Sequence, residues 1–314
     1  MITNMKISGT GSFVPSIVCT NEYLATKVDT TPEWIYANLG IKERRIANLE
    51  ENTSDLAYWA GKRAIEDAAL KPEDIDMIIL ATTTPDRQAP STACLVQERL
   101  GCTYAAAFDI NAVCTGFLYA LSIASQFIHA GTYTHILVIG ADTFSKITDW
   151  TKRDCVFFGD GAGAVVVSQN NKKNGYFNFK LHADGTGKDN FTIPITEPRY
   201  FTMNGKAVYN TATTVLPVVI EEVLYDSHLT IDDVTYMIPH QPSINILKET
   251  ARKIHLPFEQ VLTNMDKYAN TSGATIPILL DETKKKGLLH RNDAILFAAV
   301  GSGWTYGAAI MRWI

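Results

Sequence analysis

Two stretches rich in small residues decide the fold: residues 159–167 read GDGAGAVVV, and residues 301–310 read GSGWTYGAAI. In each of them a turn of small residues runs into an apolar strand. The two stretches lie almost half a chain length apart. A repeat on that scale determines architecture before any single motif does, so the same order of elements should surround both stretches.

The elements around the two stretches do follow one order. Each half has a helix pattern, then a polar turn, then an apolar strand, and later a second apolar strand. In the first half these are the helix at 56–70 and the strands at 77–81 and 135–140, and in the second half the helix at 215–225, the strand that begins at 236 and the strand at 294–300. The sequence therefore predicts a duplicated structure.

Strands that are almost continuously apolar and alternate with helices are typical of mixed or parallel sheets covered by helices on both faces. We expect two such sheets to share a central layer of helices. The polar, turn-rich stretch SQNNKKNG at residues 168–175 predicts the boundary between the halves. The chain is thus divided into residues 1–170 and 171–314, as two parts of one compact body.

Composition narrows the class of protein. The 314 residues are 46% hydrophobic and 19% charged, which predicts a globular protein with a large core. A formal net charge of -5 argues against a nucleic-acid partner. The five cysteines form no CxxC pair, and the longest apolar runs considered, such as residues 294–300, are too short to span a bilayer. We therefore expect free thiols, no metal site, no membrane anchor and a cytoplasmic location.

One cysteine stands apart from the others. Residues 108–121, FDINAVCTGFLYAL, predict a strand, a short turn and an apolar helix that begins at or just after Cys114. The dipole at a helix N-terminus favours a thiolate, so we expect a lowered pKa and a nucleophilic sulfur. The alternative is that Cys114 is a small buried apolar residue, as most free cysteines are. Structural roles of that kind are expected for Cys19, Cys94, Cys102 and Cys155.

The second half supplies possible partners for a nucleophile. His240 follows an apolar strand and lies between two prolines, at the end of a strand where sites on α/β sheets gather. Asn270 precedes a helix pattern, and the turn at 301–303 could present a backbone N–H to an oxyanion. Each feature also has a structural interpretation. His240 could be a structural histidine whose hydrogen bonds are made within the protein, Asn270 a helix N-cap, and residues 301–303 a tight turn.

Taken in order, five motifs resemble the ketoacyl-carrier-protein synthase III family. They are INAVCTGF at 110–117, FGDGAGA at 158–164, PHQP at 239–242, NTS at 270–272 and GSGWTYG at 301–307. Further agreement at residues 9–15, 29–35 and 40–44 extends the resemblance over the whole chain. It implies a thiolase-like fold, in which duplicated α/β halves form a five-layer αβαβα arrangement, and a homodimer.

The resemblance also implies a two-step reaction. Cys114 takes the acyl group from an acyl-coenzyme A, and malonyl-acyl-carrier protein then loses carbon dioxide and condenses with it, giving a 3-oxoacyl-carrier protein that initiates fatty acid synthesis. His240 and Asn270 would stabilise the enolate oxygen, and the backbone N–H groups of Cys114, Ser302 and Gly303 the acyl-cysteine oxygen. Coenzyme A enters as part of the substrate, so no cofactor is expected.

The resemblance also implies substrate-binding positions, and these match the family less closely than the catalytic positions do. Trp34 and Arg153 match positions that pack around the adenine of coenzyme A. The other implied substrate-binding residues are Met203, Gly205, Ser243, Ala89 and Phe157, and those implied in carrier docking are Lys206, Arg252 and Lys253. Three asparagines, Asn38, Asn210 and Asn245, stand where family members often carry basic residues.

Ala89 stands where a bulky phenylalanine often reaches across the dimer to close the acyl pocket. We therefore expect a roomier pocket, partly refilled by Phe157, that accepts starters longer or wider than acetyl. The alternative function is a specialised ketosynthase or acyltransferase of the same fold. The intact Cys114, His240 and Asn270 argue against a non-enzymatic binding protein. The stretch at 159–163 also lacks the GxGxxG spacing of a nucleotide-binding turn.

Overall fold

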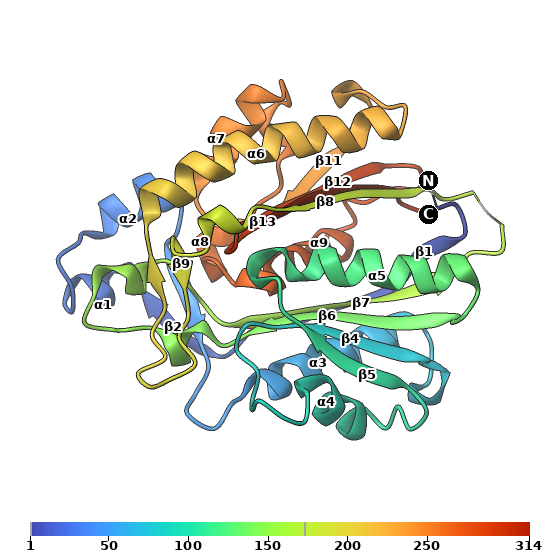
Figure 1. Cartoon of the computed structure of the whole chain (residues 1–314), viewed down its shortest axis with the longest axis horizontal. Helices are drawn as coiled ribbons and strands as arrows, with labels where there is room; N and C mark the ends of the chain where they lie inside the picture. Colours follow the sequence, from blue (N-terminus) through green and yellow to red (C-terminus); the bar gives the residue numbers. More distant parts are fainter. Residues whose placement is uncertain (1, 173) are drawn as a thin grey trace.

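The computed structural model describes residues 2–172 and 174–314, and its two main sheets lie face to face with helices between and outside them (Figure 1). The first sheet has the strand order β1-β7-β6-β4-β5 and the second β11-β12-β13-β8. The strands of the first sheet are β1 (Met5–Phe13), β4 (Met77–Ala81), β5 (Ala106–Ile110), β6 (His135–Asp142) and β7 (Gly161–Gln169). Those of the second are β8 (Phe177–Ala183), β11 (Tyr236–Pro239), β12 (Ala294–Gly301) and β13 (Thr305–Arg312).

Strand pairing confirms the predicted duplication. In the first sheet β4 and β6 are parallel, β6 and β7 antiparallel, and β7 and β1 antiparallel. The second sheet repeats this series with β11 and β12, then β12 and β13, then β13 and β8. Within the described ranges β5 has no full counterpart, since an isolated parallel bridge between Met237 and Val261 stands in its place.

The helices form three layers, which confirms the five-layer arrangement (Figure 1). The outer helices α3 and α4 cover the first sheet, α6 covers the second with α7 packed beside it, and α5 and α9 lie between the two sheets. Their bounds are α3 (Thr53–Asp67), α4 (Thr92–Leu100), α5 (Gly116–Ala130), α6 (Gly205–Asp226), α7 (Ile244–Lys253) and α9 (Thr275–Lys285). Each half thus gives one helix to the shared layer, and the two halves pack into one body.

Smaller elements lie at one end of the sheets (Figure 1). They are β2 (Ile17–Thr20), α1 (Asn21–Ala25), α2 (Pro32–Leu39), β3 (Glu43–Ile46), β9 (Phe191–Thr192), β10 (Thr202–Met203) and α8 (Met265–Tyr268). The 3-10 turns are η1 (Pro72–Asp74), η2 (Val113–Thr115), η3 (Phe144–Ile147), η4 (Arg153–Val156), η5 (Gly185–Gly187), η6 (Ile231–Asp233), η7 (Phe258–Gln260) and η8 (Ser272–Ala274).

The central helix α5 corrects one expectation about apolar runs. With the turn before it, the segment Val113–Ala130 is long and apolar enough to cross a bilayer, with a mean hydropathy of 1.3. In the folded chain α5 contacts strands of both sheets, among them β4, β6, β12 and β13. A helix covered on two faces needs apolar residues around most of its circumference, so its composition is explained by its place in the core.

The first strand, the joint between the halves and the last strand meet at one place. Ile2 forms a bridge with Phe177, and Met311 pairs with the same residue. A Cβ on Gly175 would lie 2.9 Å from the Met5 carbonyl oxygen and 3.2 Å from a side-chain carbon of Ile314. The sheets divide between the end of β7 and the start of β8. The division into halves at 1–170 and 171–314 stays a prediction.

Candidate active site

Two short 3-10 turns, one from each half of the chain, carry residues of the site. Turn η2 leads into α5 and packs on the end of β12, whereas η8 leads into α9 and packs on the end of β6. Each contains a residue other than glycine with a left-handed backbone: φ is 49° at Val113 and 51° at Ser272. This conformation is strained for residues with a side chain, and such strain gathers at functional sites.

Cys114 lies within η2, directly before α5, as expected. It is 8% exposed, and its Sγ lies 3.7 Å from the hydroxyl oxygen of Ser272. Burial raises the thiol pKa to about 12, with a further contribution from the charge of Asp142. The expectation of a lowered pKa is therefore wrong for the free protein, because desolvation of a thiolate outweighs the favourable groups at the helix start.

His240 follows β11 and is held by its main chain and its neighbour. Its N–H donates to the Ala298 carbonyl at 2.8 Å, and the buried Gln241 side chain exchanges hydrogen bonds with Asn264. Burial lowers the pKa of His240 to about 3, although the backbone of Ser272 partly opposes the shift. The imidazole is therefore neutral at pH 7, and its Nδ1 has no hydrogen-bond partner among the residues that the structure describes.

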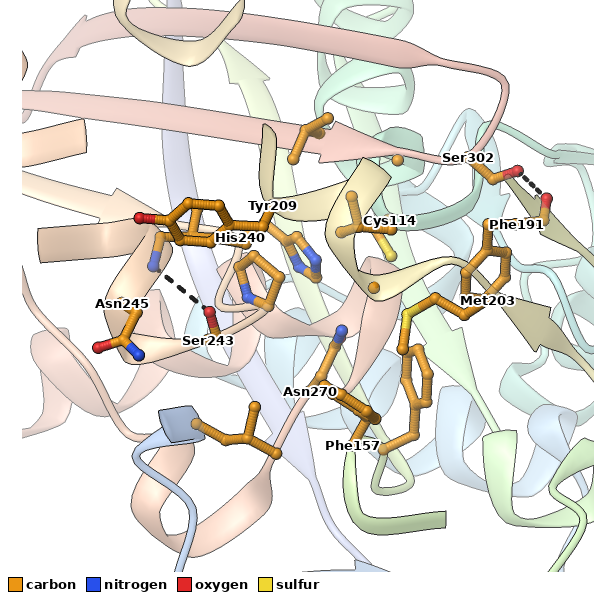
Figure 2. A pocket seen from close by; sticks show the side chains of 18 of the residues that line it. Cys114, Phe157, Phe191, Met203, Tyr209, His240, Ser243, Asn245, Asn270 and Ser302 are labelled. Atoms are coloured by element: carbon orange, nitrogen blue, oxygen red, sulfur yellow. Dashed lines mark hydrogen bonds between the residues drawn. The ribbon is translucent and has the colours of Figure 1, made fainter. Parts of the chain in front are cut away.

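Asn270 is fixed by both its backbone and its side chain. Its N–H donates to the Phe157 carbonyl at 3.1 Å, and its own carbonyl accepts from Gly159, which ties η8 to the GDGAG turn. The side-chain Oδ1 accepts from the Ser272 N–H at 2.8 Å. This local cap-like bond orients the amide so that Nδ2 remains available as a donor. Figure 2 shows Cys114, His240 and Asn270 converging on one space.

Hydrogen bonds join the turn at 301–304 to the loop that carries Cys114, and we call this set of bonds the clasp. Thr305 Oγ1 donates to the Ala112 carbonyl at 3.1 Å, and the Thr115 and Thr305 hydroxyl oxygens lie 2.9 Å apart. A Cβ on Gly301 would come within 2.8 Å of Thr115 Oγ1, so only glycine fits there without displacement. Ser302 Oγ donates to the Phe191 carbonyl at 2.6 Å, which fixes the tip of the turn.

A cavity of about 240 Å³ joins these groups. The predicted site residues that line it are Cys114, His240, Asn270, Ser302, Trp34, Phe157, Met203, Gly205 and Ser243. Arg153 lies beside it, with its guanidinium carbon 3.9 Å from the centre of the Trp34 ring. Gly303 follows Ser302 in the turn. Ala89, in contrast, lies on an exposed loop and is absent from the lining of this cavity.

The predicted carrier-docking residues lie on α6 and α7. Lys206 is exposed in the first turn of α6. Arg252 and Lys253 both approach Glu249, at 2.8 Å and 3.8 Å, so part of their charge is already neutralised. Of the three asparagines noted above, Asn38 and Asn245 line the cavity, whereas Asn210 is exposed on α6.

Sequence reasoning missed a cluster of four buried phenylalanines beside the nucleophile, which we call the phenylalanine cluster: Phe144, Phe158, Phe191 and Phe201. Phe158 and Phe191 line the cavity, and Val113 packs against the cluster. The Phe144 and Phe158 rings stack with their centres 4.3 Å apart. Other cavity residues that were missed include Leu39, Val208, Tyr209, Ile246 and Trp304. Phe191 comes from the two-residue strand β9, which leaves no periodic signal in the sequence.

Comparison with known proteins decides the family. Models of 3-oxoacyl-[acyl-carrier-protein] synthase III and of its C-terminal part match residues 108–185 and 224–313. The β-ketoacyl-[acyl-carrier-protein] synthase III of Clostridium acetobutylicum is 46% identical, with 99% of each chain covered. The chain belongs to the 3-oxoacyl-[acyl-carrier-protein] synthase III family.

Other synthase III proteins are similar to this chain over nearly its full length, in sequence and in structure. The enzyme of Geobacillus kaustophilus is 46% identical over 98% of each chain. The crystal structure of the Aquifex aeolicus synthase III matches with a TM-score of 0.95 at 44% identity, covering 98% of this chain and 100% of that one. These findings confirm the predicted fold and the predicted enzyme class, an acyltransferase of the synthase III type. Among the described residues, His, Cys, Asp and Glu form no group suited to a metal ion.

Proposed function

We propose that Cys114 accepts an acyl group from an acyl-coenzyme A and that the protein condenses this group with malonyl-acyl-carrier protein, the step that initiates fatty acid synthesis. One observation carries the assignment of residues. A thiol, an imidazole and an amide from both halves of the chain line a single cavity, beside a turn that could hold an oxyanion. Family membership supplies the reaction, and the geometry supports the proposed roles.

In the condensation step, loss of carbon dioxide leaves negative charge on the thioester oxygen of the malonyl unit. A neutral imidazole can donate a hydrogen bond there, and the burial of His240 keeps it neutral across the physiological range. Asn270 is suited to donate a second bond, since its Oδ1 is already occupied by Ser272. Two fixed donors in a buried site stabilise the developing charge without reorganising during the reaction.

In the acylation step, negative charge develops on the carbonyl oxygen attached to Cys114. The N–H of Cys114 itself and those of Ser302 and Gly303 are proposed to hold it. The clasp between Thr115 and Thr305 supports this role, because it sets the distance between the two chain segments that carry these donors. Neither segment alone supplies the full set.

The remaining binding assignments are also proposals. Trp34 and Arg153 would bind the adenine of coenzyme A between them, which requires the guanidinium to move away from its present stacked position. Lys206, Arg252 and Lys253 would dock the acidic carrier protein, with Glu249 released from Arg252 on binding. The protein would work in the cytoplasm as a homodimer without a cofactor.

The width of the acyl pocket depends on residues of this chain and on residues that a second copy would contribute. On the side built by this chain, the phenylalanine cluster leaves aromatic rings against the loop of Cys114. The roomier pocket predicted from Ala89 would have to open on the other side, where that residue of a second copy would lie. Acylation rates with acetyl-, hexanoyl-, octanoyl- and glutaryl-coenzyme A measure the outcome, and a strong preference for acetyl would contradict the roomy pocket.

Mass spectrometry of the protein after incubation with acyl-coenzyme A tests the central assignment. We expect one acyl group on Cys114 and none in the Cys114→Ala variant. Cys102→Ala is the matched control, because Cys102 is also buried with a pKa raised to about 11 but does not line the cavity. His240→Ala and Asn270→Ala should become acylated yet release little carbon dioxide from malonyl-acyl-carrier protein. Normal release by both variants would refute their roles.

A further inference from the structure

A buried carboxylate behind Cys114 has no part in the reaction described so far. Asp142 ends β6 and is fully buried. Its Oδ1 accepts from Thr82 Oγ1 and from the N–H and hydroxyl of Thr84, at 3.1–3.2 Å, and from the Thr83 N–H at 2.7 Å. Its Oδ2 accepts from the Gly273 N–H at 3.2 Å. Among the described residues, no Lys or Arg forms an ion pair with it.

Ser272 connects this carboxylate to the nucleophile. The Cys114 thiol donates toward its hydroxyl oxygen, with Sγ and Oγ 3.7 Å apart. The N–H of the next residue, Gly273, donates to Asp142 Oδ2 at 3.2 Å, so the turn holds Ser272 beside the carboxylate, and its side chain lowers the pKa of Asp142. Because the Cys114 thiol donates to the Ser272 oxygen, the hydroxyl hydrogen of Ser272 is directed away from the sulfur, and Asp142 on the other side can only accept it. A lone pair of the hydroxyl oxygen is then left facing the thiol.

The backbone at Ser272 holds the hydroxyl in that position. Its φ of 51° is left-handed, and its N–H is bonded to Asn270 Oδ1. A strained conformation in a buried turn persists only when the surroundings fix it. Here the strain places one hydroxyl between a thiol and a carboxylate, which a relaxed turn with another side chain would not do.

The chemistry of acylation requires a proton acceptor at this place. A thiol with a pKa near 12 is almost fully protonated at neutral pH, and the weak base His240, with a pKa of about 3, is a poor acceptor. Burial raises the pKa of Asp142 above that of an ordinary carboxyl, which makes its carboxylate a better base.

We propose that Ser272 and Asp142 form a proton relay for Cys114, an inference that rests on the proposed acylation of this cysteine. As Sγ attacks the thioester carbon, its proton passes to Ser272 Oγ and the hydroxyl proton of Ser272 passes to Asp142. When the carbon–sulfur bond to coenzyme A breaks, the electron pair leaves with that sulfur. The proton returns by the same path to the departing thiolate, so the exchange is balanced. Ser272 touches a reacting atom, whereas Asp142 acts through it as a positioning residue.

Single-turnover acylation by acetyl-coenzyme A, followed between about pH 7 and pH 9, separates the relay from a structural role. Two other titratable groups bear on the relay, His240 and Asp160, with pKa values of about 3 and about 6, so neither titrates strongly in this window. We expect the Ser272→Ala variant to react roughly 100-fold more slowly at pH 7. Its rate should then climb about tenfold per pH unit, because free thiolate replaces the relay. The unaltered protein should show a flatter profile.

Asp142→Asn should repeat this behaviour, and Thr82→Val serves as the control for packing. Thr82 bonds to the Asp142 oxygen that lies away from Gly273, so its loss should change the rate by one factor at every pH. If Asp142→Asn fails to fold, Ser272→Ala alone decides. A deficit in Ser272→Ala that is constant with pH, or absent, would overturn the relay. Absence of acylation in the unaltered protein would instead refute the proposed function.

Discussion

Gly301→Ala tests how tightly the two halves must meet at the active site. The added Cβ would lie 2.8 Å from Thr115 Oγ1, 2.9 Å from Thr305 Oγ1 and 3.0 Å from the Ala112 carbonyl oxygen. Ordinary carbon contacts begin at 3.4 Å, so each neighbour must retreat by about half an ångström. All three atoms belong to the clasp that joins η2 to the turn before β13.

The expected cost has two parts. Overpacking a well-filled site destabilises a protein by about 1–3 kcal/mol, and the clasp's hydrogen bonds contribute about 1 kcal/mol each. A displacement of about 1 Å at a reacting centre can lower the rate about 100-fold, so half that displacement should lower kcat/KM about tenfold. The thermal midpoint should fall by several degrees.

Steady-state condensation and thermal unfolding measure both effects. Gly185→Ala is the matched control, since a Cβ there meets nothing within 4 Å. It should leave kcat/KM and the midpoint unchanged. If Gly301→Ala matched the control in both measurements, the turn would have more freedom than the structure indicates, and its proposed role in holding an oxyanion would lose its support.

Three further changes have defined outcomes. Trp34→Ala should raise KM for acetyl-coenzyme A about tenfold with kcat unchanged, since stacking on a base contributes about 1–3 kcal/mol. Tyr36→Ala, on the same helix but outside the cavity, should not, and equal effects would contradict the adenine site. His240 binds protons less well folded than unfolded, so stability should fall on acidification below about pH 6.5, by up to about 1.4 kcal/mol per pH unit; urea unfolding of His240→Asn should show a shallower decline. Phe191→Leu should raise the hexanoyl-to-acetyl ratio of acylation rates about tenfold, and an unchanged ratio would place Phe191 outside the acyl pocket.

The duplicated fold could be predicted because it leaves periodic signals in the sequence. The strand predicted at residues 77–81 is β4, and those predicted at 135–140 and 294–300 fall within β6 and β12. The helix predicted at 215–225 is the C-terminal half of α6, which begins ten residues earlier at Gly205. Residues 205–211 of this helix include no buried residue, so an apolar pattern could not reveal its first turns.

The site was predictable only in part, for physical reasons. The ordered motifs pointed to Cys114, His240 and Asn270, which do line one cavity. The thiol pKa was predicted in the wrong direction because a helix start can be recognised in sequence but the depth of burial cannot. Asp142 is a further case: it is one of many acidic residues until the sheet places it behind Ser272.

The meeting of Ile2, Phe177 and Met311 has a consequence for the order of the halves. The chain could be cut between the two halves, and the ends of the described chain joined instead, without changing the strand order of either sheet. We expect such a circular permutant, in which Cys114 follows His240 and Asn270, to keep the same cavity. The sequence order of these side chains would then reflect where the chain is cut, whereas the chemistry depends only on their arrangement in space.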